Sequence, residues 1–153
     1  MTDKVIKEHH TSSTEGTPYV RFNKDAGNNL RGTLVMLDPK SGTETRRIAG
    51  FPHIRRIYVL NRGVRLLFHE KPFFVEEKID GYNSRLFFHR DRMFAASRGG
   101  FICPFSTEWA DIWREEYRLD RFFADYPLHV LCGEIVGDNP YNVQRDPNLP
   151  HGA

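Results

Sequence analysis

The sequence has few cysteines and no long apolar run. Of its 153 residues only two are cysteines, Cys103 and Cys132, and neither stands at zinc-ligand spacing to another cysteine or histidine, so we expect no disulfide and no zinc site. No apolar stretch approaches the roughly 20 residues that a membrane-spanning helix needs. Residues 1–10 are polar and lack the apolar core of a secretory signal. These absences favour a soluble, cytoplasmic protein.

A strong charge imbalance is also missing. The net charge is +2 and the isoelectric point is near 8.6, which by itself is too mild to indicate a nucleic-acid partner. Arginines are nevertheless concentrated within residues 46–65: Arg46, Arg47, Arg55, Arg56, Arg62 and Arg65. Such a cluster is typical either of an ordinary solvated basic face or of a phosphate-binding one, and the sequence leaves both interpretations open.

The first third of the chain predicts β structure after a polar arm. Residues 1–28 are rich in Thr, Ser, Gly and Asn, and we expect a flexible arm with one short strand over Tyr19–Phe22. Two apolar stretches, 32–38 and 43–48, flank a turn-rich segment and predict a β-hairpin. The stretch 54–68 mixes basic and apolar residues without a clear period.

The rest of the chain predicts more strands and one main helix. Apolar residues 72–75 and a hairpin over 82–96 suggest that Lys78 lies between two strands. A helix is expected from Ser106 or Thr107, whose hydroxyls can cap its free amides, to Ala124. Residues 129–137 resemble a buried strand with a single carboxylate. The prediction is an α+β domain over residues 29–153, mainly antiparallel.

The pattern lysine, any residue, aspartate, glycine occurs at Lys78-Ile79-Asp80-Gly81. Alone it is weak, because a lone lysine is nearly always a solvated charge. Its neighbours strengthen it, since Glu76 precedes the lysine and Asn83 follows it. The phrases Ser97-Arg98-Gly99-Gly100-Phe101 and Gly133-Glu134-Ile135-Val136-Gly137 then come in order.

In this order and spacing the motifs resemble those of the covalent nucleotidyltransferases, the ligases and capping enzymes. Together with Gly50-Phe51-Pro52-His53-Ile54-Arg55-Arg56, the segment around Lys78 is similar to the homodimeric ATP-dependent RNA ligases best known from archaea. The resemblance covers about residues 30–143. It implies the N-terminal part of a nucleotidyltransferase (adenylation) domain, with antiparallel strands around a nucleotide cleft.

The resemblance implies that Lys78 is the nucleophile, storing AMP from ATP as a phosphoramidate before RNA ends with a 5′-phosphate and a 3′-hydroxyl are joined. Its amine must attack in neutral form, so the site needs burial, a neighbouring cation or a bound Mg²⁺ ion. The resemblance also implies that Arg98 contacts the ribose and phosphate, where a planar donor fork suits anionic oxygens, and that Glu134 accepts hydrogen bonds from the ribose hydroxyls. A surface hairpin arginine and an inward Glu paired with an arginine are the alternatives.

The remaining expected roles are less direct. Gly81 lets the backbone approach the nucleotide, unless it is a plain turn residue. By the resemblance, Glu76 lies near the adenine and Asn83 supports sealing of the RNA ends. Arg55 and Arg56 are candidate contacts to RNA phosphates.

After Tyr141 the sequence departs from complete members of the resembled family. It shows no adenine-stacking aromatic, no second metal-associated glutamate segment, no terminal pair of lysines and no dimerising region. We therefore expect weak activity from the chain alone, and a complementing C-terminal ligase segment as a possible partner beside RNA. The alternatives are one half of a split ligase, a noncatalytic RNA-binding remnant, and guanylyl transfer or DNA sealing.

Overall fold

The computed structural model describes residues 7–12, 16–23, 30–52, 54, 56–69 and 71–137. In chain order the elements are β1 (Lys7–Thr11), β2 (Pro18–Phe22), β3 (Leu34–Leu37), β4 (Glu44–Ile48), α1 (Leu60–Phe68), β5 (Tyr82–His89), β6 (Arg92–Ser97), α2 (Pro104–Glu116), α3 (Leu119–Asp125) and β7 (Leu131–Ile135). They form a four-stranded sheet in the order β1-β2-β3-β4 and a three-stranded sheet in the order β6-β5-β7. All of these pairings are antiparallel, so the predicted α+β class with antiparallel strands is confirmed.

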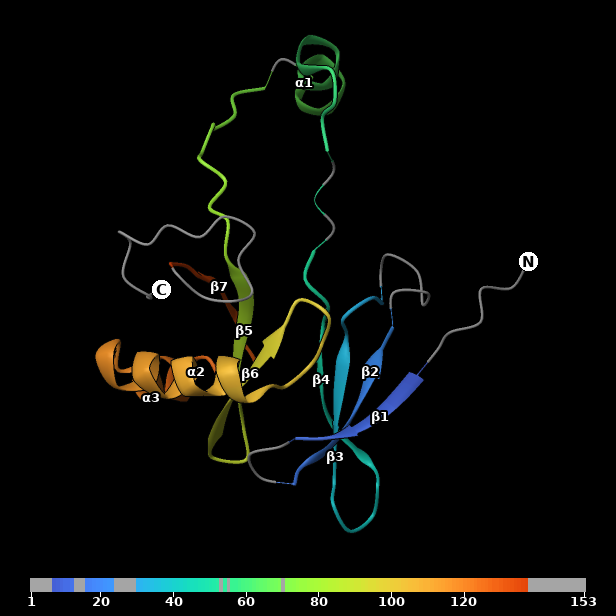
Figure 1. The fold of residues 1–153 in the computed structure, drawn as a ribbon, viewed down its shortest axis with the longest axis vertical. Helices are drawn as coiled ribbons and strands as arrows, with labels where there is room; N and C mark the ends of the chain where they lie inside the picture. Colours follow the sequence, from blue (N-terminus) through green and yellow to red (C-terminus); the bar gives the residue numbers. More distant parts are fainter. Residues whose placement is uncertain are drawn as a thin grey trace, which may run out of the picture.

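The three-stranded sheet is the middle layer of the molecule. One of its faces packs on the four-stranded sheet through Phe87 and Phe94, which join a buried cluster with Leu34 and Met36 of β3. The other face packs on α2 and α3, and Figure 1 shows these helices and the four-stranded sheet on opposite sides of β5 and β6. Apolar side chains on both faces of β5 and β6 produce this arrangement, because successive side chains of a strand point to opposite faces of the sheet.

Both predicted hairpins are present. In the β3–β4 hairpin the Asp38 carboxylate accepts hydrogen bonds from the Lys40 and Ser41 amides at 3.0 and 2.9 Å, which closes the turn. In the β5–β6 hairpin Arg90 and Asp91 have φ angles of 49° and 62°, as a tight hairpin turn of this kind requires. Local turn chemistry thus explains both.

The N-terminal region forms one more strand than predicted. The expected strand over Tyr19–Phe22 is confirmed as β2, but β1 pairs with it as an edge strand of the sheet. No residue of β1 is fully buried, so it lacks the apolar alternation that would have indicated it. It is held instead by the ion pair of Glu8 with Arg21 and by the His10 ring stacked on Tyr19 at 5.4 Å.

The prediction of a single helix from Ser106 or Thr107 to Ala124 was wrong in its details. The helix begins at Pro104, and the Thr107 hydroxyl donates to the Cys103 carbonyl at 3.0 Å instead of capping the free amides. It breaks into α2 and α3 because Arg118 adopts a left-handed φ of 52°. After the break, Leu119 and Phe123 pack in the same cluster as the side chains of α2, a tertiary contact that local sequence does not reveal.

The segment between β4 and β5 projects away from both sheets, with α1 at its far end (Figure 1). No residue of α1 is buried. The expected strand at 72–75 is absent, and Phe74 and Val75 are 94% and 87% exposed. The described part of the chain supplies no layer against these side chains. None of the described helices is long and apolar enough to cross a membrane.

Lowering the pH below neutral is expected to destabilise the fold through His89. The side chain is only 8% exposed, and its Nε2 atom lies 3.3 Å from the Thr45 hydroxyl. Burial and, secondarily, the cations Arg90 and Arg46 lower the pKa of His89, so the unfolded chain binds a proton more readily than the folded chain. Stability should therefore fall as the pH drops through the unfolded pKa of about 6.5.

Urea unfolding at pH 7.5 and pH 5.5 measures this effect. We expect H89Q to lose less stability than the wild type between the two pH values. Exposed His69 offers a matched control, because H69Q should retain the wild-type pH dependence. Equal pH dependence in the wild type and H89Q would contradict the assignment.

Candidate active site

A large cavity opens where the two sheets meet the projecting segment. Its volume is about 1030 Å³. Its lining residues are Phe51, Ile54, Arg56, Glu77, Lys78, Ile79, Asp80, Gly81, Tyr82, Asn83, Ser97, Arg98, Gly99, Phe101 and Glu134. They come from the segment after β4, the start of β5 and the segment that leads into it, the end of β6 and the turn after it, and β7. A space of this size suits a ligand at the upper end of the small-molecule range.

Pairing of β5 with β7 builds one wall. Asn83 lies opposite Glu134 in the antiparallel register, and its Nδ2 atom donates to Glu134 Oε1 at 3.3 Å and to the Gly133 carbonyl at 3.5 Å. The other amide atom, Asn83 Oδ1, is buried and has no hydrogen-bond partner among the residues described. An unsatisfied acceptor at a cavity wall is costly unless a ligand or water donates to it.

Gly81 is required by packing against β7. A Cβ atom on this residue would lie 2.8 Å from the Ile135 carbonyl oxygen and 3.0 Å from the Glu134 Cβ atom. Gly81 lines the cavity, and the close approach that the structure shows is to the neighbouring strand. The glycine therefore serves the position of Glu134 as well as the shape of the cavity.

Arg98 is exposed on the turn after β6 and lines the cavity together with Phe51. Its guanidinium carbon is 5.5 Å from the centre of the Phe51 ring. Gly100, with φ at +84°, completes the turn and packs against the backbone of Gly32. The turn is thus fixed by backbone contact with the four-stranded sheet.

Lys78 is exposed within the segment that leads into β5. Its Nζ atom donates to the neighbouring Ile79 carbonyl at 3.3 Å. Two carboxylates of the same segment, Glu77 and Asp80, also line the cavity. The amine therefore faces a space that contains both acidic and basic groups.

The structure gathers six of the eight predicted site residues in this cavity: Lys78, Gly81, Asn83, Arg98, Glu134 and Arg56. Glu76 is exposed and does not line it, whereas its neighbour Glu77 does. Arg55, like His53, lies outside the described residues.

The described arginines of the cluster at residues 46–65 lie in different environments. Arg47 pairs with Glu44 at 2.7 Å, and the Arg46 guanidinium packs 5.6 Å from the Phe87 ring on β5. Arg62 and Arg65 belong to α1. Of the two open interpretations, the ordinary structural one fits Arg46 and Arg47, and among the cluster's described arginines only Arg56 lines the cavity.

The sequence did not predict the aromatic lining of the cavity, which consists of Phe51, Tyr82 and Phe101. Phe51 and Phe101 nevertheless belong to the motifs that carry the family resemblance. The Phe101 ring packs against the Arg21 guanidinium carbon at 3.7 Å, which holds it at the cavity edge. Tyr82 lies with its hydroxyl 3.5 Å from Cys103 Sγ. Burial, together with this thiol, raises the pKa of Tyr82, so its hydroxyl stays neutral.

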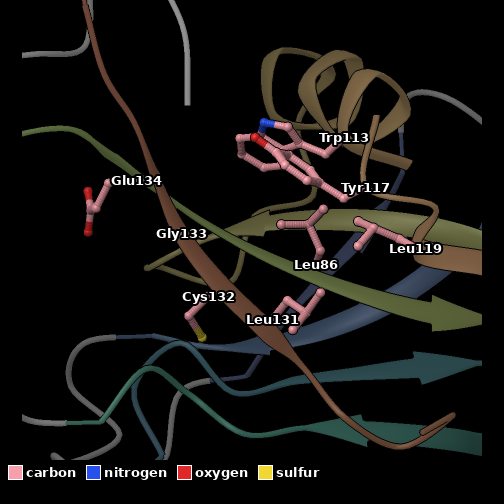
Figure 2. Close-up of a pocket in the computed structure, with 8 residues that line it drawn as sticks. All are labelled: Leu86, Trp113, Tyr117, Leu119, Leu131, Cys132, Gly133 and Glu134. Carbon is pink, nitrogen blue, oxygen red and sulfur yellow. The ribbon is translucent and has the colours of Figure 1, made fainter. Parts of the chain in front are cut away.

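A second, smaller pocket of about 280 Å³ lies on the helical side of β7 (Figure 2). Leu86, Trp113, Leu119 and Leu131 give it an apolar lining. Figure 2 shows the Glu134 side chain directed away from these groups, toward the other side of the strand. Glu134 borders both spaces, but Lys78, Asn83 and Arg98 line the larger cavity and not this pocket.

Metal ligands are not clustered in the part of the chain that the structure describes. It contains no group of three or more His, Cys, Asp or Glu side chains that could hold a metal ion. Carboxylates from the cavity wall, including Glu77, Asp80 and Glu134, are nevertheless the oxygen ligands that suit Mg²⁺. One or two carboxylates suffice where phosphate oxygens and water complete the coordination.

Comparison with solved structures identifies long relatives of the same fold. Two crystal forms of an archaeal ATP-dependent RNA ligase match 95% and 97% of this chain, at 31% and 30% identity and a TM-score of 0.69 in both cases. A protein of Aquifex aeolicus, provisionally described as an ATP-dependent DNA ligase, matches 88% at 41% identity and a TM-score of 0.68. The match spans 37% of each archaeal chain and 34% of the Aquifex chain. This chain thus spans about a third of the length of these relatives.

Sequence comparisons agree. An uncharacterized protein of Methanocaldococcus jannaschii is 31% identical over 121 residues, which are 78% of this chain and 28% of that protein. The model of the RNA ligase family matches residues 71–152, which include Lys78, Arg98 and Glu134. Since this match covers more than half of the 153 residues, the chain belongs to the RNA ligase family.

Proposed function

We propose that this chain forms the lysine-bearing part of the adenylation domain of an RNA ligase, which uses ATP and Mg²⁺ to join 5′-phosphate and 3′-hydroxyl RNA ends. One observation supports this proposal above the others. Side chains from separate chain segments, Lys78, Arg98 and Glu134, line a single cavity of about 1030 Å³.

The first step is transfer of AMP to Lys78. The neutral Nζ atom attacks the α-phosphorus of ATP, the bond between the α-phosphorus and the bridging oxygen breaks, and pyrophosphate leaves with the bonding electrons. The amine releases a proton and becomes a phosphoramidate. AMP then passes to the 5′-phosphate of one RNA end, and attack by the 3′-hydroxyl of the other end releases it and forms the phosphodiester.

The proposed roles follow from the donors and acceptors on each wall. Arg98 supplies a charged planar fork to phosphate or ribose oxygens, and Glu134 accepts hydrogen bonds from ribose hydroxyls. The buried, unpartnered Oδ1 atom of Asn83 is available to a hydroxyl donor, in keeping with a role at the RNA ends. Arg56 is suited to RNA phosphates; the proposed contacts of Arg55 and Glu76 stay predictions.

Bound Mg²⁺ would neutralise charge on the phosphates of ATP. One or two of the cavity carboxylates Glu77, Asp80 and Glu134 would hold it, together with phosphate oxygens and water. The chain's own contribution is to hold the nucleotide between the Phe51 and Arg98 wall and the β5–β7 wall. Aromatic rings at the cavity edge, Phe51 and Phe101, can stack on a base.

We further propose that additional ligase segments complete the cleft, either as further chain or as a separate partner. Apolar side chains of the projecting segment support this view, because Leu60, Phe74 and Val75 are 71%, 94% and 87% exposed. An exposed apolar surface of this kind marks an interaction site or an aggregation liability. The cations expected to help Lys78 react would come from those segments, since preorganised donors on developing charge contribute about 2.7–4 kcal/mol each.

Incubation with α-labelled ATP and Mg²⁺ tests the proposed function. The chain is assayed alone and with the remaining part of an archaeal RNA ligase supplied separately. Acid-labile label on this chain, competed by ATP more strongly than by GTP, followed by sealing of RNA ends in preference to nicked DNA, is the expected result. Salt-sensitive RNA binding without any label in either arm would instead favour a noncatalytic RNA-binding protein.

Replacement of Arg98 by alanine is expected to weaken ATP binding. Loss of charged hydrogen bonds to phosphate or ribose oxygens should raise the Kd by roughly 10- to 100-fold, since such bonds contribute about 1.5–3 kcal/mol. Titration calorimetry with ATP measures the change. R47A removes an exposed, ion-paired arginine outside the cavity and should leave the Kd unchanged; an equal loss in both variants would point to general electrostatics.

A further inference from the structure

Arg85 is a buried cation in the middle of β5, at the junction of the two sheets. Its side chain is among the largest in the molecule that are fully enclosed, with 1% exposure of the residue. Burial lowers the pKa of the guanidinium to about 10, so it remains charged at neutral pH. A buried charge is costly unless it is well hydrogen-bonded, so its partners indicate why it is there.

The partners of Arg85 are three backbone carbonyls from three different segments. Its Nη1 atom donates to the Ala49 carbonyl at 2.5 Å, and its Nη2 atom donates to the carbonyls of Gly32 and Ser97 at 2.7 and 2.9 Å. Gly32 precedes β3, Ala49 follows β4, and Ser97 ends β6. One guanidinium therefore fastens both ends of the β3–β4 hairpin to the neighbouring sheet.

Two of these carbonyls lie next to the wall of the cavity. Ser97 immediately precedes Arg98, and Ala49 lies two residues before Phe51. The Arg98 guanidinium carbon lies 5.5 Å from the centre of the Phe51 ring. Arg85 thus joins the two backbone segments that carry these side chains. Their relative position depends on how the turn after β6 sits against the segment after β4.

Backbone meets backbone closely at this junction. Gly32, Gly50 and Gly100 meet neighbouring backbone so closely that added Cβ atoms would lie 2.2, 2.0 and 2.9 Å from carbonyl oxygens. Side chains are thus excluded from these contacts. The Arg21 guanidinium also donates to the Gly99 carbonyl at 3.1 Å, but Arg85 alone among the described side chains donates to Ala49, Gly32 and Ser97 together. No carboxylate among the described residues pairs with it, so the hydrogen bonds to backbone are its only strong partners there.

We infer that Arg85 is a positioning residue for the nucleotide cavity, setting the Phe51 and Arg98 wall through the backbone of Ala49, Gly32 and Ser97. It does not line the cavity and touches no ligand there. The inference deepens the proposed function and rests on it only for the effect on ATP. The geometry of the wall can be measured without any nucleotide.

Arg85→Lys keeps the charge but replaces the fork with one nitrogen, which cannot reproduce the two-nitrogen arrangement on three carbonyls. Phe87→Leu is the matched control. Phe87 is buried in the same strand two residues further on, in the cluster shared with β3, and it does not line the cavity. Both variants should lower the thermal midpoint, so stability alone does not separate them.

The first readout is the nuclear Overhauser contact between the Arg98 side chain and the Phe51 ring in selectively labelled protein without ligand. We expect the contact in the wild type and in F87L and its loss in R85K. Its retention in R85K would overturn the inference. If R85K does not give folded protein, R85Q, whose shorter amide keeps two donors, is judged by the same contact.

The second readout is the ATP Kd in two backgrounds. In wild-type background R85K should raise the Kd by about 10-fold, and in an R98A background by less than about 2-fold, because the two residues act through one wall. Equal losses in both backgrounds would mean that Arg85 acts only through general stability. A wild type that shows the contact but binds no ATP would contradict the proposed function, whereas the positioning role would still be decided by the contact.

Discussion

Replacing Lys78 with alanine is expected to abolish AMP transfer to the protein completely, including in the presence of the remaining part of an archaeal ligase. The phosphoramidate forms on one nitrogen atom, and alanine offers no nucleophile in its place. The cavity should still admit ATP, because Arg98, Glu134 and Phe51 remain. The measurement is acid-labile label from α-labelled ATP, with ATP binding followed in parallel.

Lys71 provides the matched control for this experiment. It is an exposed lysine of the same projecting segment, seven positions earlier, and it does not line the cavity. K71A should be labelled as the wild type is. Label that persists in K78A, or that disappears equally in K71A, would contradict the assignment of the nucleophile.

Gly32→Ala is expected to cause a large loss of stability. Gly32 has φ at +74°, which penalises any side chain by about 1–2 kcal/mol. The new Cβ would also lie 2.2 Å from the Arg98 carbonyl oxygen, a clash that only backbone movement can relieve. We expect a total cost of about 4 kcal/mol or more, together with weaker ATP binding, because the turn that carries Arg98 must move.

Gly42 separates the two contributions. It has a similar φ of +68° in the β3–β4 turn, but no atom lies within 4 Å of an added Cβ. G42A should therefore cost only the backbone penalty of about 1–2 kcal/mol and leave ATP binding unchanged. Urea unfolding compares the variants, and equal costs would show that the close packing of Gly32 against the turn is not a constraint.

The sequence correctly predicted those elements that are stabilised by residues close together in the chain. The β3–β4 and β5–β6 hairpins follow from apolar stretches around turns, which need no knowledge of the rest of the chain. The strand β1 was missed because its stability comes from pairing and from contacts such as His10 on Tyr19. The break at Arg118 was also missed, since Phe123, which follows it, packs in a cluster with residues of β5 and β6 that are distant in the sequence.

The candidate site was predicted from sequence motifs, so residues outside those motifs were not identified. Lys78, Arg98 and Glu134 come from separate phrases, and the structure brings them to one cavity. Phe101 was within a quoted phrase, but only the fold shows its ring at the cavity edge. No sequence pattern distinguished Arg85, because its proposed role depends on hydrogen bonds to three backbone carbonyls that are distant in sequence.

Peptide mapping by mass spectrometry after incubation with ATP and Mg²⁺ tests the central claim most directly. We expect one added AMP on the peptide that contains Lys78, with the remaining part of an archaeal ligase present to complete the cleft. Removal by acid would identify the bond as a phosphoramidate. An unmodified Lys78 peptide under these conditions, or AMP on another lysine of the chain, would contradict the account.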